Sequence, residues 1–186
     1  MSNSRVHSSV QQMVDDGLIL DNVVVSADNF NFKKYRIAHK NEDGSNFTQD
    51  DCAKMLDLTD KAVVSKFERN DSRIDDRTYS IFLLMTGNHP YYSLEPRSKN
   101  PPEKSTLIIN TPAPKTIKAA RMSISGLKQN QASKLLGLHP KMYGKYESTT
   151  ASKTNKRSPS PHAWTLFLLL TKQHPYYQLD YKNKDV

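Results

Sequence analysis

The strongest constraint on the fold is a six-residue word that occurs twice. HPYYSL at residues 89–94 returns as HPYYQL at residues 174–179. Around it, residues 82–94 align with residues 167–179 at an offset of 85, and nine of the 13 positions are identical. A repeated site would give an isolated word, whereas a duplicated domain would extend the match along the chain.

The match does extend along the chain. Three further pairs of segments align: residues 49–58 with 129–138, residues 66–68 with 145–147, and residues 32–36 with 117–121. The offset changes only between predicted elements, where insertions and deletions are tolerated. The sequence is therefore a tandem duplication of a unit of roughly 70–80 residues.

Apolar residues recur at helical spacing in both copies, which predicts an all-α fold. We expect two tandem helix-turn-helix domains of four to five helices each, with a short strand before each copy at Val23–Val25 and Leu107–Ile109. The predicted division is an N-terminal segment at residues 1–30, domain 1 at 31–94, a proline-rich linker at 95–115 and domain 2 at 116–182.

The second copy shows the two short helices most clearly. Gln129–Leu136 has its apolar residues on one face, and Gly137 supplies the left-handed residue that ends the helix. The next helix is expected from Pro140 to about Glu147, with Tyr143 and Tyr146 turned inward. Two more helices are expected, over residues 117–123 and 161–171.

This segment resembles a known family. Residues 127–147, LKQNQASKLLGLHPKMYGKYE, are similar to the phage-repressor/Cro-like (XRE) helix-turn-helix: a Leu-x-Gln opening, a small residue in the second helix, Leu-Gly at the turn and Glu at the end. Residues 47–68 resemble it too, with one extra residue near the turn and Asp57 where glycine is expected. The resemblance implies sequence-specific binding to duplex DNA.

A recognition helix in the major groove presents polar side chains outward. Lys141 and Lys145 are one turn apart and can donate to guanine, and Met142 can contact a thymine methyl group. The resemblance assigns Gln129 to a backbone phosphate. The expected DNA contacts of domain 2 are Gln129, Asn130, His139, Lys141, Met142, Lys145, Lys153, Lys156 and Arg157, the last three on a loop read as a backbone-contacting arm.

The first copy offers a second, more acidic set. Its expected DNA contacts are Gln49, Lys61, Ala62, Ser65, Lys66 and Arg69. Five aspartates lie near them: Asp57, Asp60, Asp71, Asp75 and Asp76. Two alternatives stay open: this copy binds DNA more weakly, or it serves in dimerisation or in binding a protein partner.

Net charge divides along the repeat. The whole chain carries +8, with −3 on residues 1–94 and +11 on residues 95–186. A half this basic favours a polyanionic partner, because neutralising phosphates releases counterions. A solubilising surface is the alternative explanation.

Other function classes lack support. His89 and His174 each stand beside a proline, with no second metal ligand at a suitable spacing, so we expect a structural role there. No catalytic constellation, metal site, cofactor or small-molecule site is expected, and the protein is predicted not to be an enzyme. The absence of a long apolar run or signal peptide, together with the single Cys52, predicts a cytoplasmic protein, associated with the nucleoid when bound.

The sequence thus predicts a transcriptional regulator, with operator occlusion by a repressor as its mechanism and operator DNA as its partner. Two half-sites about one helical turn, ~34 Å, apart would suit the tandem copies. A homodimer formed through residues 6–25 is a further expectation. The alternative is a protein–protein adaptor, an antitoxin or a phage-type inhibitor that uses helix-turn-helix units as interaction modules.

Overall fold

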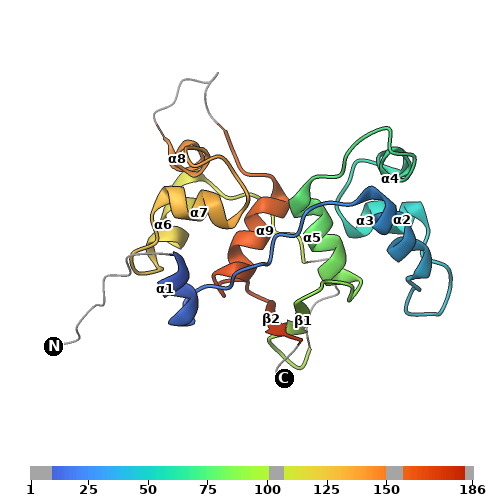
Figure 1. Ribbon diagram of the computed structural model, residues 1–186, viewed down its shortest axis with the longest axis horizontal. Coiled ribbons are helices and arrows are strands. Elements are labelled where there is room, and N and C mark those ends of the chain that lie inside the picture. Colours follow the sequence, from blue (N-terminus) through green and yellow to red (C-terminus); the bar gives the residue numbers. More distant parts are fainter. Residues whose placement is uncertain (1–9, 101–106, 150–156, 183–186) are drawn as a thin grey trace. The chain divides into compact units, whose positions relative to one another are not determined.

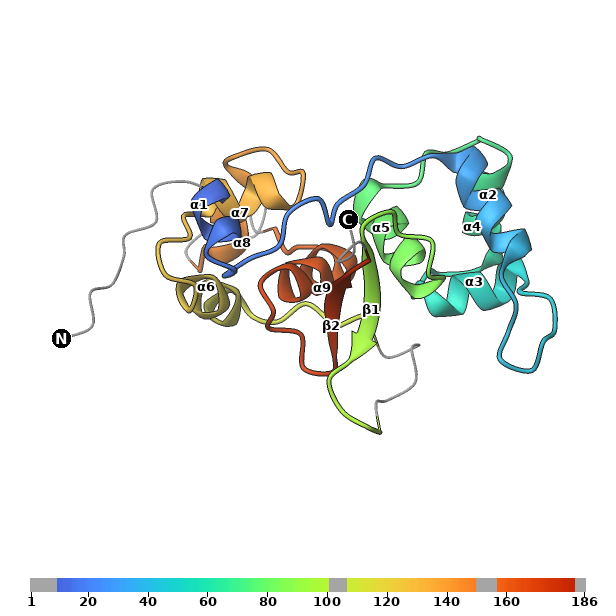
Figure 2. The ribbon, with the colours of Figure 1, turned by 60° about the horizontal axis from the view of Figure 1, so that its bottom comes forward.

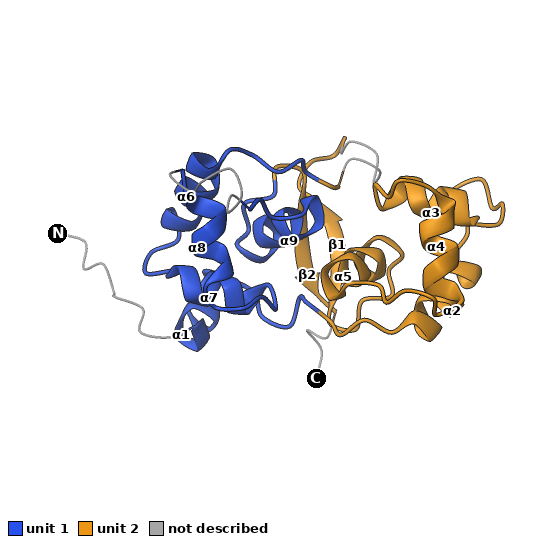
Figure 3. Ribbon diagram, turned by 90° about the horizontal axis from the view of Figure 1, so that it is seen from above, with its two compact units in different colours: residues 1–24, 109–174 blue, residues 25–108, 175–186 orange. Residues whose placement is uncertain are grey.

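A computed structural model describes residues 10–100, 107–149 and 157–182. The chain forms two compact units (Figure 3): unit 1 comprises residues 1–24 and 109–174, and unit 2 comprises residues 25–108 and 175–186. Each unit therefore combines one repeat with a segment from the opposite end of the sequence: the first repeat with the C-terminal segment, and the second repeat with the N-terminal segment. This partition differs from the expected division into contiguous domains.

Unit 2 contains the first repeat. Its elements are α2 (Asn29–Ala38), α3 (Gln49–Met55), α4 (Lys61–Glu68), α5 (Asp76–Met85), β1 (Tyr92–Pro96) and β2 (Tyr177–Tyr181) (Figure 1). Each helix begins after a side chain that accepts a hydrogen bond from the first turn. These caps are Asp28, Thr48, Asp60 and Asp75.

Unit 1 contains the second repeat. Its helices are α1 (Val10–Asp15), α6 (Pro114–Met122), α7 (Gln129–Leu135), α8 (Met142–Glu147) and α9 (Pro161–Leu170). Two of them begin elsewhere than expected. Helix α6 starts at Pro114, whose ring suits a first turn. Helix α8 starts at Met142, because the preceding residues form a turn in which Met142 N–H donates to the His139 carbonyl at 2.8 Å.

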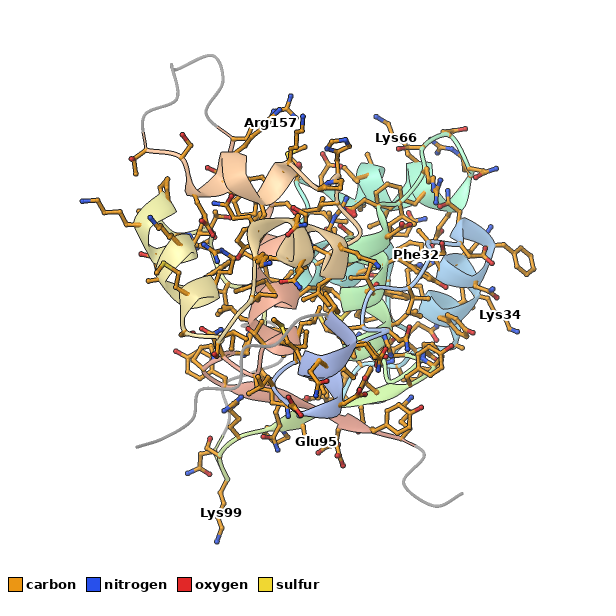
Figure 4. The ribbon with its side chains drawn as sticks, turned by 60° about the vertical axis from the view of Figure 1, so that its left-hand side comes forward. Phe32, Lys34, Lys66, Glu95, Lys99 and Arg157 are labelled. Carbon is orange, nitrogen blue, oxygen red and sulfur yellow. The ribbon has the colours of Figure 1, made fainter. Side chains whose placement is uncertain are left out.

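Aromatic side chains fill both cores. In unit 2 the ring of Phe32 lies 4.5 Å from that of Phe82, centroid to centroid, and Phe32 points into the unit (Figure 4). In unit 1 the ring of Phe167 lies 5.3 Å from Tyr143 and 5.6 Å from Trp164. Such pairs contribute about 0.5–1.5 kcal/mol beyond the burial of their area. Helices α5 and α9, which are buried on nearly every side, carry Phe82, Phe167 and Trp164, while Phe32 comes from α2 and Tyr143 from α8.

The N-terminal segment belongs to the core of unit 1. Met13, Ile19 and Val23 are at most 1% exposed, and Leu20 N–H donates to the carbonyl of Leu170 at 2.9 Å. Two of the apolar side chains that suggested dimerisation, Met13 and Ile19, are thus already buried in their own chain, whereas Val10, Leu18 and Leu20 are half-buried. A homodimer stays a prediction, but Met13 and Ile19 offer it no surface.

The expected all-α class is wrong, because the largely helical chain also has a two-stranded antiparallel sheet. The strands follow the long helices, at the two His-Pro-Tyr-Tyr words, rather than preceding each repeat. Residues 23–25 and 107–109 form no strand. Instead, Val25 N–H donates to the Ser80 hydroxyl at 2.8 Å and Ile109 N–H to that of Thr165 at 2.8 Å.

The register of the sheet is centred on equivalent residues. Strands β1 and β2 lie side by side (Figure 2), with Leu94 opposite Leu179 and Tyr92 opposite Tyr181. Leu94 and Leu179 occupy the same position in the two repeats. This is the self-complementary pairing that two copies of one strand make. The recurring word is therefore a mark of duplication, since each copy begins a strand that pairs with its counterpart.

His89 has a structural place in this word. Its buried ring accepts hydrogen bonds at Nδ1 from the backbone N–H groups of Tyr91, at 3.3 Å, and Tyr92, at 3.2 Å. These bonds hold the turn that leads into β1. Over the ranges that the structure describes, no group of three His, Cys, Asp or Glu side chains could hold a metal ion.

Candidate nucleic-acid interface

Corresponding residues at the two turns have the same left-handed backbone conformation. Gly137, between α7 and α8, has φ 63°, and Asp57, between α3 and α4, has φ 49°. Both values fall in the left-handed region, where glycine pays no steric cost and other residues are disfavoured. Asp57 thus adopts the backbone conformation of the expected glycine.

Helix α8 separates an inward and an outward face. Tyr143 and Tyr146 are buried against the core. Lys141, just before the helix, and Lys145, within it, are exposed. Neither lysine side chain has an ion-pair or hydrogen-bond partner among residues 10–100, 107–149 and 157–182. Met142 is half-buried beside them, so the outward face carries free positive charge next to an apolar side chain.

Ser133 joins the two helices of this motif. Its buried hydroxyl accepts a hydrogen bond from Tyr143 N–H at 3.0 Å and donates to the Pro140 carbonyl at 3.2 Å. One side chain of α7 thereby satisfies backbone groups at the start of α8. This contact holds the start of α8 against α7.

A buried ionic network braces the motif in unit 1. The Arg121 guanidinium donates to the Glu147 carboxylate at 2.6 and 3.1 Å and to the Leu127 carbonyl at 2.6 Å. Gln129 Nε2 donates to the same carboxylate at 2.7 Å. The Arg121 and Glu147 side chains are only 13% and 3% exposed. Helix α6, the start of α7 and the end of α8 are thus joined through one carboxylate.

Unit 2 has the same network. Arg36 pairs with Glu68 and donates to the Phe47 carbonyl at 2.8 Å, and Gln49 Nε2 donates to Glu68 at 2.6 Å. A side-chain amide has two N–H donors. At both Gln49 and Gln129 one donor is used internally, and a second remains for the predicted phosphate contact.

The remaining predicted contacts of domain 2 lie mostly at the surface. Asn130 and His139 are exposed, at the start of α7 and just before α8. Arg157 is exposed ahead of α9 (Figure 4). Lys153 and Lys156 lie outside the described residues.

Domain 1 presents a smaller free charge. Lys61, Ala62 and Lys66 are exposed on α4, and Lys66 points away from the ribbon (Figure 4). Arg69 donates to the Asp71 carboxylate at 2.8 Å and to the hydroxyl of the half-buried Ser65 at 2.9 Å. Exposed pairs of this kind contribute at most about 1 kcal/mol, but this one offsets the charge that Arg69 would offer to DNA.

Surface ion pairs recur elsewhere in unit 2. Lys54 lies 2.6 Å from Asp50 on α3, and Arg77 lies 2.8 Å from Asp75 at the start of α5. The acidic residues of this repeat therefore engage several of its cations. Lys141, just before α8, and Lys145, within it, have no such partners in the described part of the chain.

The buried Arg–Glu network was missed by sequence reasoning, although the repeat contained the signal. Arg36 aligns with Arg121 and Glu68 with Glu147. A basic and an acidic residue retained in both copies, in segments otherwise poor in identity, could have indicated a pair.

Comparison with protein-family models, with curated proteins and with solved structures finds no match to this chain. The resemblance to the XRE family therefore stays a prediction. Within the residues described, no helix is long and apolar enough to cross a membrane.

Proposed function

We propose that this protein is a sequence-specific, duplex-DNA-binding regulator that represses transcription by occupying an operator. The observation that carries the proposal is the outward face of α8, where Lys141 and Lys145 are exposed and unpaired while Tyr143 and Tyr146 anchor the helix. A groove-reading helix needs this combination of a fixed inner face and free donors outside.

The chemistry of the contact follows from the side chains. Lys141 and Lys145 donate to guanine O6 and N7, and Met142 contacts a thymine methyl group. The second amide N–H of Gln129, with the first N–H groups of α7, binds a phosphate and sets the position of α8 in the groove. The buried Arg121–Glu147 pair keeps these two elements in a fixed geometry before DNA arrives.

Unit 2 makes the weaker contact in this proposal. Lys61 and Lys66 are free on α4, but Arg69 is engaged by Asp71. Repression then needs no further chemistry, since a protein bound across a promoter excludes the polymerase.

Selection from a randomised duplex library at about 0.15 M salt tests the proposal, because nonspecific phosphate binding is weak there. We expect an enriched motif. The double variant Lys141→Ala/Lys145→Ala should bind it at least about tenfold more weakly, since one good base contact contributes about 1–3 kcal/mol. The matched control is Lys115→Ala/Lys118→Ala, which removes two exposed lysines of α6 and should keep the motif.

The outcomes separate the alternatives. Salt-sensitive retention without an enriched motif would leave a nonspecific polyanion binder. No retention at all would refute DNA binding and favour the adaptor alternative, which the ion-paired, acidic surface of unit 2 supports.

A further inference from the structure

Unit 2 carries a groove that shares only Arg69 with the predicted DNA contacts. It has a volume of about 630 Å³ and lies between the outer face of α2 and the C-terminal end of α4. Phe30, Lys33, Lys34 and Ile37 line its α2 side, and Arg69 lies at its α4 end.

The apolar residues of this groove are unusually open to solvent. Phe30 is 78% exposed and Ile37 is 56% exposed. They are seven residues apart on one helix, so they lie on the same face, separated by about 10 Å. Two large apolar side chains flanking a hollow are typical of a site that buries them on binding a partner.

The charges of the groove select the kind of partner. Its carboxylates are already engaged: Asp28 caps α2 through Phe30 N–H at 2.9 Å and Asn31 N–H at 3.1 Å, and Glu68 belongs to the buried network. Lys33 and Lys34 lie between the two apolar residues and have no side-chain partner in the described ranges. Lys34 extends away from the ribbon (Figure 4).

We propose that this groove binds an acidic amphipathic helix of a partner protein, with apolar side chains two turns apart and carboxylates on the turn between them. Those carboxylates would meet Lys33 and Lys34, and the apolar side chains would cover Phe30 and Ile37. This is the helix-in-groove mode of recognition. The proposal stands independently of DNA binding by α8.

Segments of this chain do not fit as the occupant. The residues that the structure does not describe are 1–9, 101–106, 150–156 and 183–186. None of these four segments holds more than one acidic residue, so none can match both lysines.

The second repeat provides a natural control. At the positions of Phe30 and Ile37 it has Lys115 and Met122. The Phe30→Lys variant therefore installs the residue that the other copy already uses, in the same helix and at an exposed position. Unit 1 consequently lacks the apolar pair that defines the groove.

The experiment uses the full chain and a synthetic probe. The probe is a fluorescent 15-residue helical peptide with two leucines seven residues apart and two glutamates on the turn between them. We expect saturable binding in fluorescence anisotropy, weakened at least tenfold by Phe30→Lys and by Lys33→Glu/Lys34→Glu, and unchanged by Met122→Ser. The charge-reversed variant should instead bind a peptide that carries lysines in place of the glutamates.

Several results would overturn the proposal. These are no binding by the unaltered protein, equal binding by the Phe30→Lys variant, or loss of binding on Met122→Ser. Loss of DNA affinity in the Phe30→Lys variant, with competition between duplex DNA and the peptide, would make the groove a DNA contact instead. Circular dichroism of each variant distinguishes lost contacts from lost folding.

Discussion

Replacing Arg121 by methionine tests whether the buried network holds the proposed DNA-reading motif together. The change removes three hydrogen bonds, two to Glu147 and one to the Leu127 carbonyl. It leaves a carboxylate whose side chain is 3% exposed with Gln129 as its remaining partner. Breaking a buried pair on one side costs about 3–5 kcal/mol.

This cost is a large share of the total stability of a small unit, which is about 5–15 kcal/mol. For 60–100 residues, each kcal/mol shifts Tm by about 4–8 °C, so unit 1 should melt about 12 °C lower or more. The double variant Arg121→Met/Glu147→Leu should recover most of the loss, since it leaves no uncompensated charge.

The assay is thermal and urea unfolding followed by tryptophan fluorescence. Trp164 is the single tryptophan of the chain and is buried in unit 1, so its emission reports on that unit. Lys118→Met, an exposed cation of the same helix, is the control and should change stability by less than about 0.5 kcal/mol. A loss below about 1 kcal/mol in Arg121→Met, or a double variant as unstable as the sum of its parts, would refute the reasoning.

Four further predictions concern single positions. Asp57→Gly should stabilise unit 2 by about 0.5–1 kcal/mol because φ is 49° there, and Gly137→Ala should destabilise unit 1 by about 1 kcal/mol. Urea unfolding measures both changes, and effects opposite in sign to those expected would contradict a left-handed conformation at both positions. Tyr143→Phe removes a buried hydroxyl that has no hydrogen-bond partner in the described structure, so stability should stay equal or rise by up to about 1 kcal/mol; a clear loss in calorimetry would reveal a missed partner. Burial raises the pKa of Cys52 to about 12, so the thiol is protonated at neutral pH and should react with a disulfide reagent only when unit 2 opens; fast labelling of the native protein would contradict this. Hydrogen bonds from Thr48 lower the pKa of Asp51, so the cap stabilises α3 above the unfolded pKa of Asp51 and loses that effect as pH falls through the folded value. The Thr48→Val variant loses the side-chain half of this cap. Urea unfolding as a function of pH should therefore show a smaller loss of stability on acidification in Thr48→Val, and an equal loss would contradict this.

Local sequence patterns predicted the helices of the two repeats, but they could not predict the pairing of strands that lie far apart in the sequence. The inward Tyr143 and Tyr146 follow from their spacing, and the turn at Gly137 follows from its backbone freedom. By contrast, β1 is only five residues long and pairs with a strand far along the chain, so no window of sequence contains the pair. Each His-Pro-Tyr-Tyr word alone looks like a closing turn.

The candidate site could likewise be predicted only in part from the sequence. The exposure of Lys141 and Lys145 could be anticipated from helical periodicity and is found in the structure. The Arg121–Glu147 pair joins residues 26 positions apart, and the engagement of Arg69 by Asp71 depends on side-chain rotamers that sequence does not encode directly. The first is hinted at only by the retention of both residues in the two repeats, and the second has no sequence signal.

Because a C-terminal segment completes unit 2, the order of synthesis determines how long strand β1 waits for its partner. Strand β1 is synthesised long before β2, because its last residue, Pro96, precedes its partner Tyr177 by about 80 residues. At about 5–20 residues per second, roughly 80 residues of further synthesis leave β1 without its partner for about 4–16 seconds. An unpaired strand edge is a template for pairing with another chain. Nascent chains carried on one message are therefore exposed to mispairing during this interval, which ends only when β2 has been released.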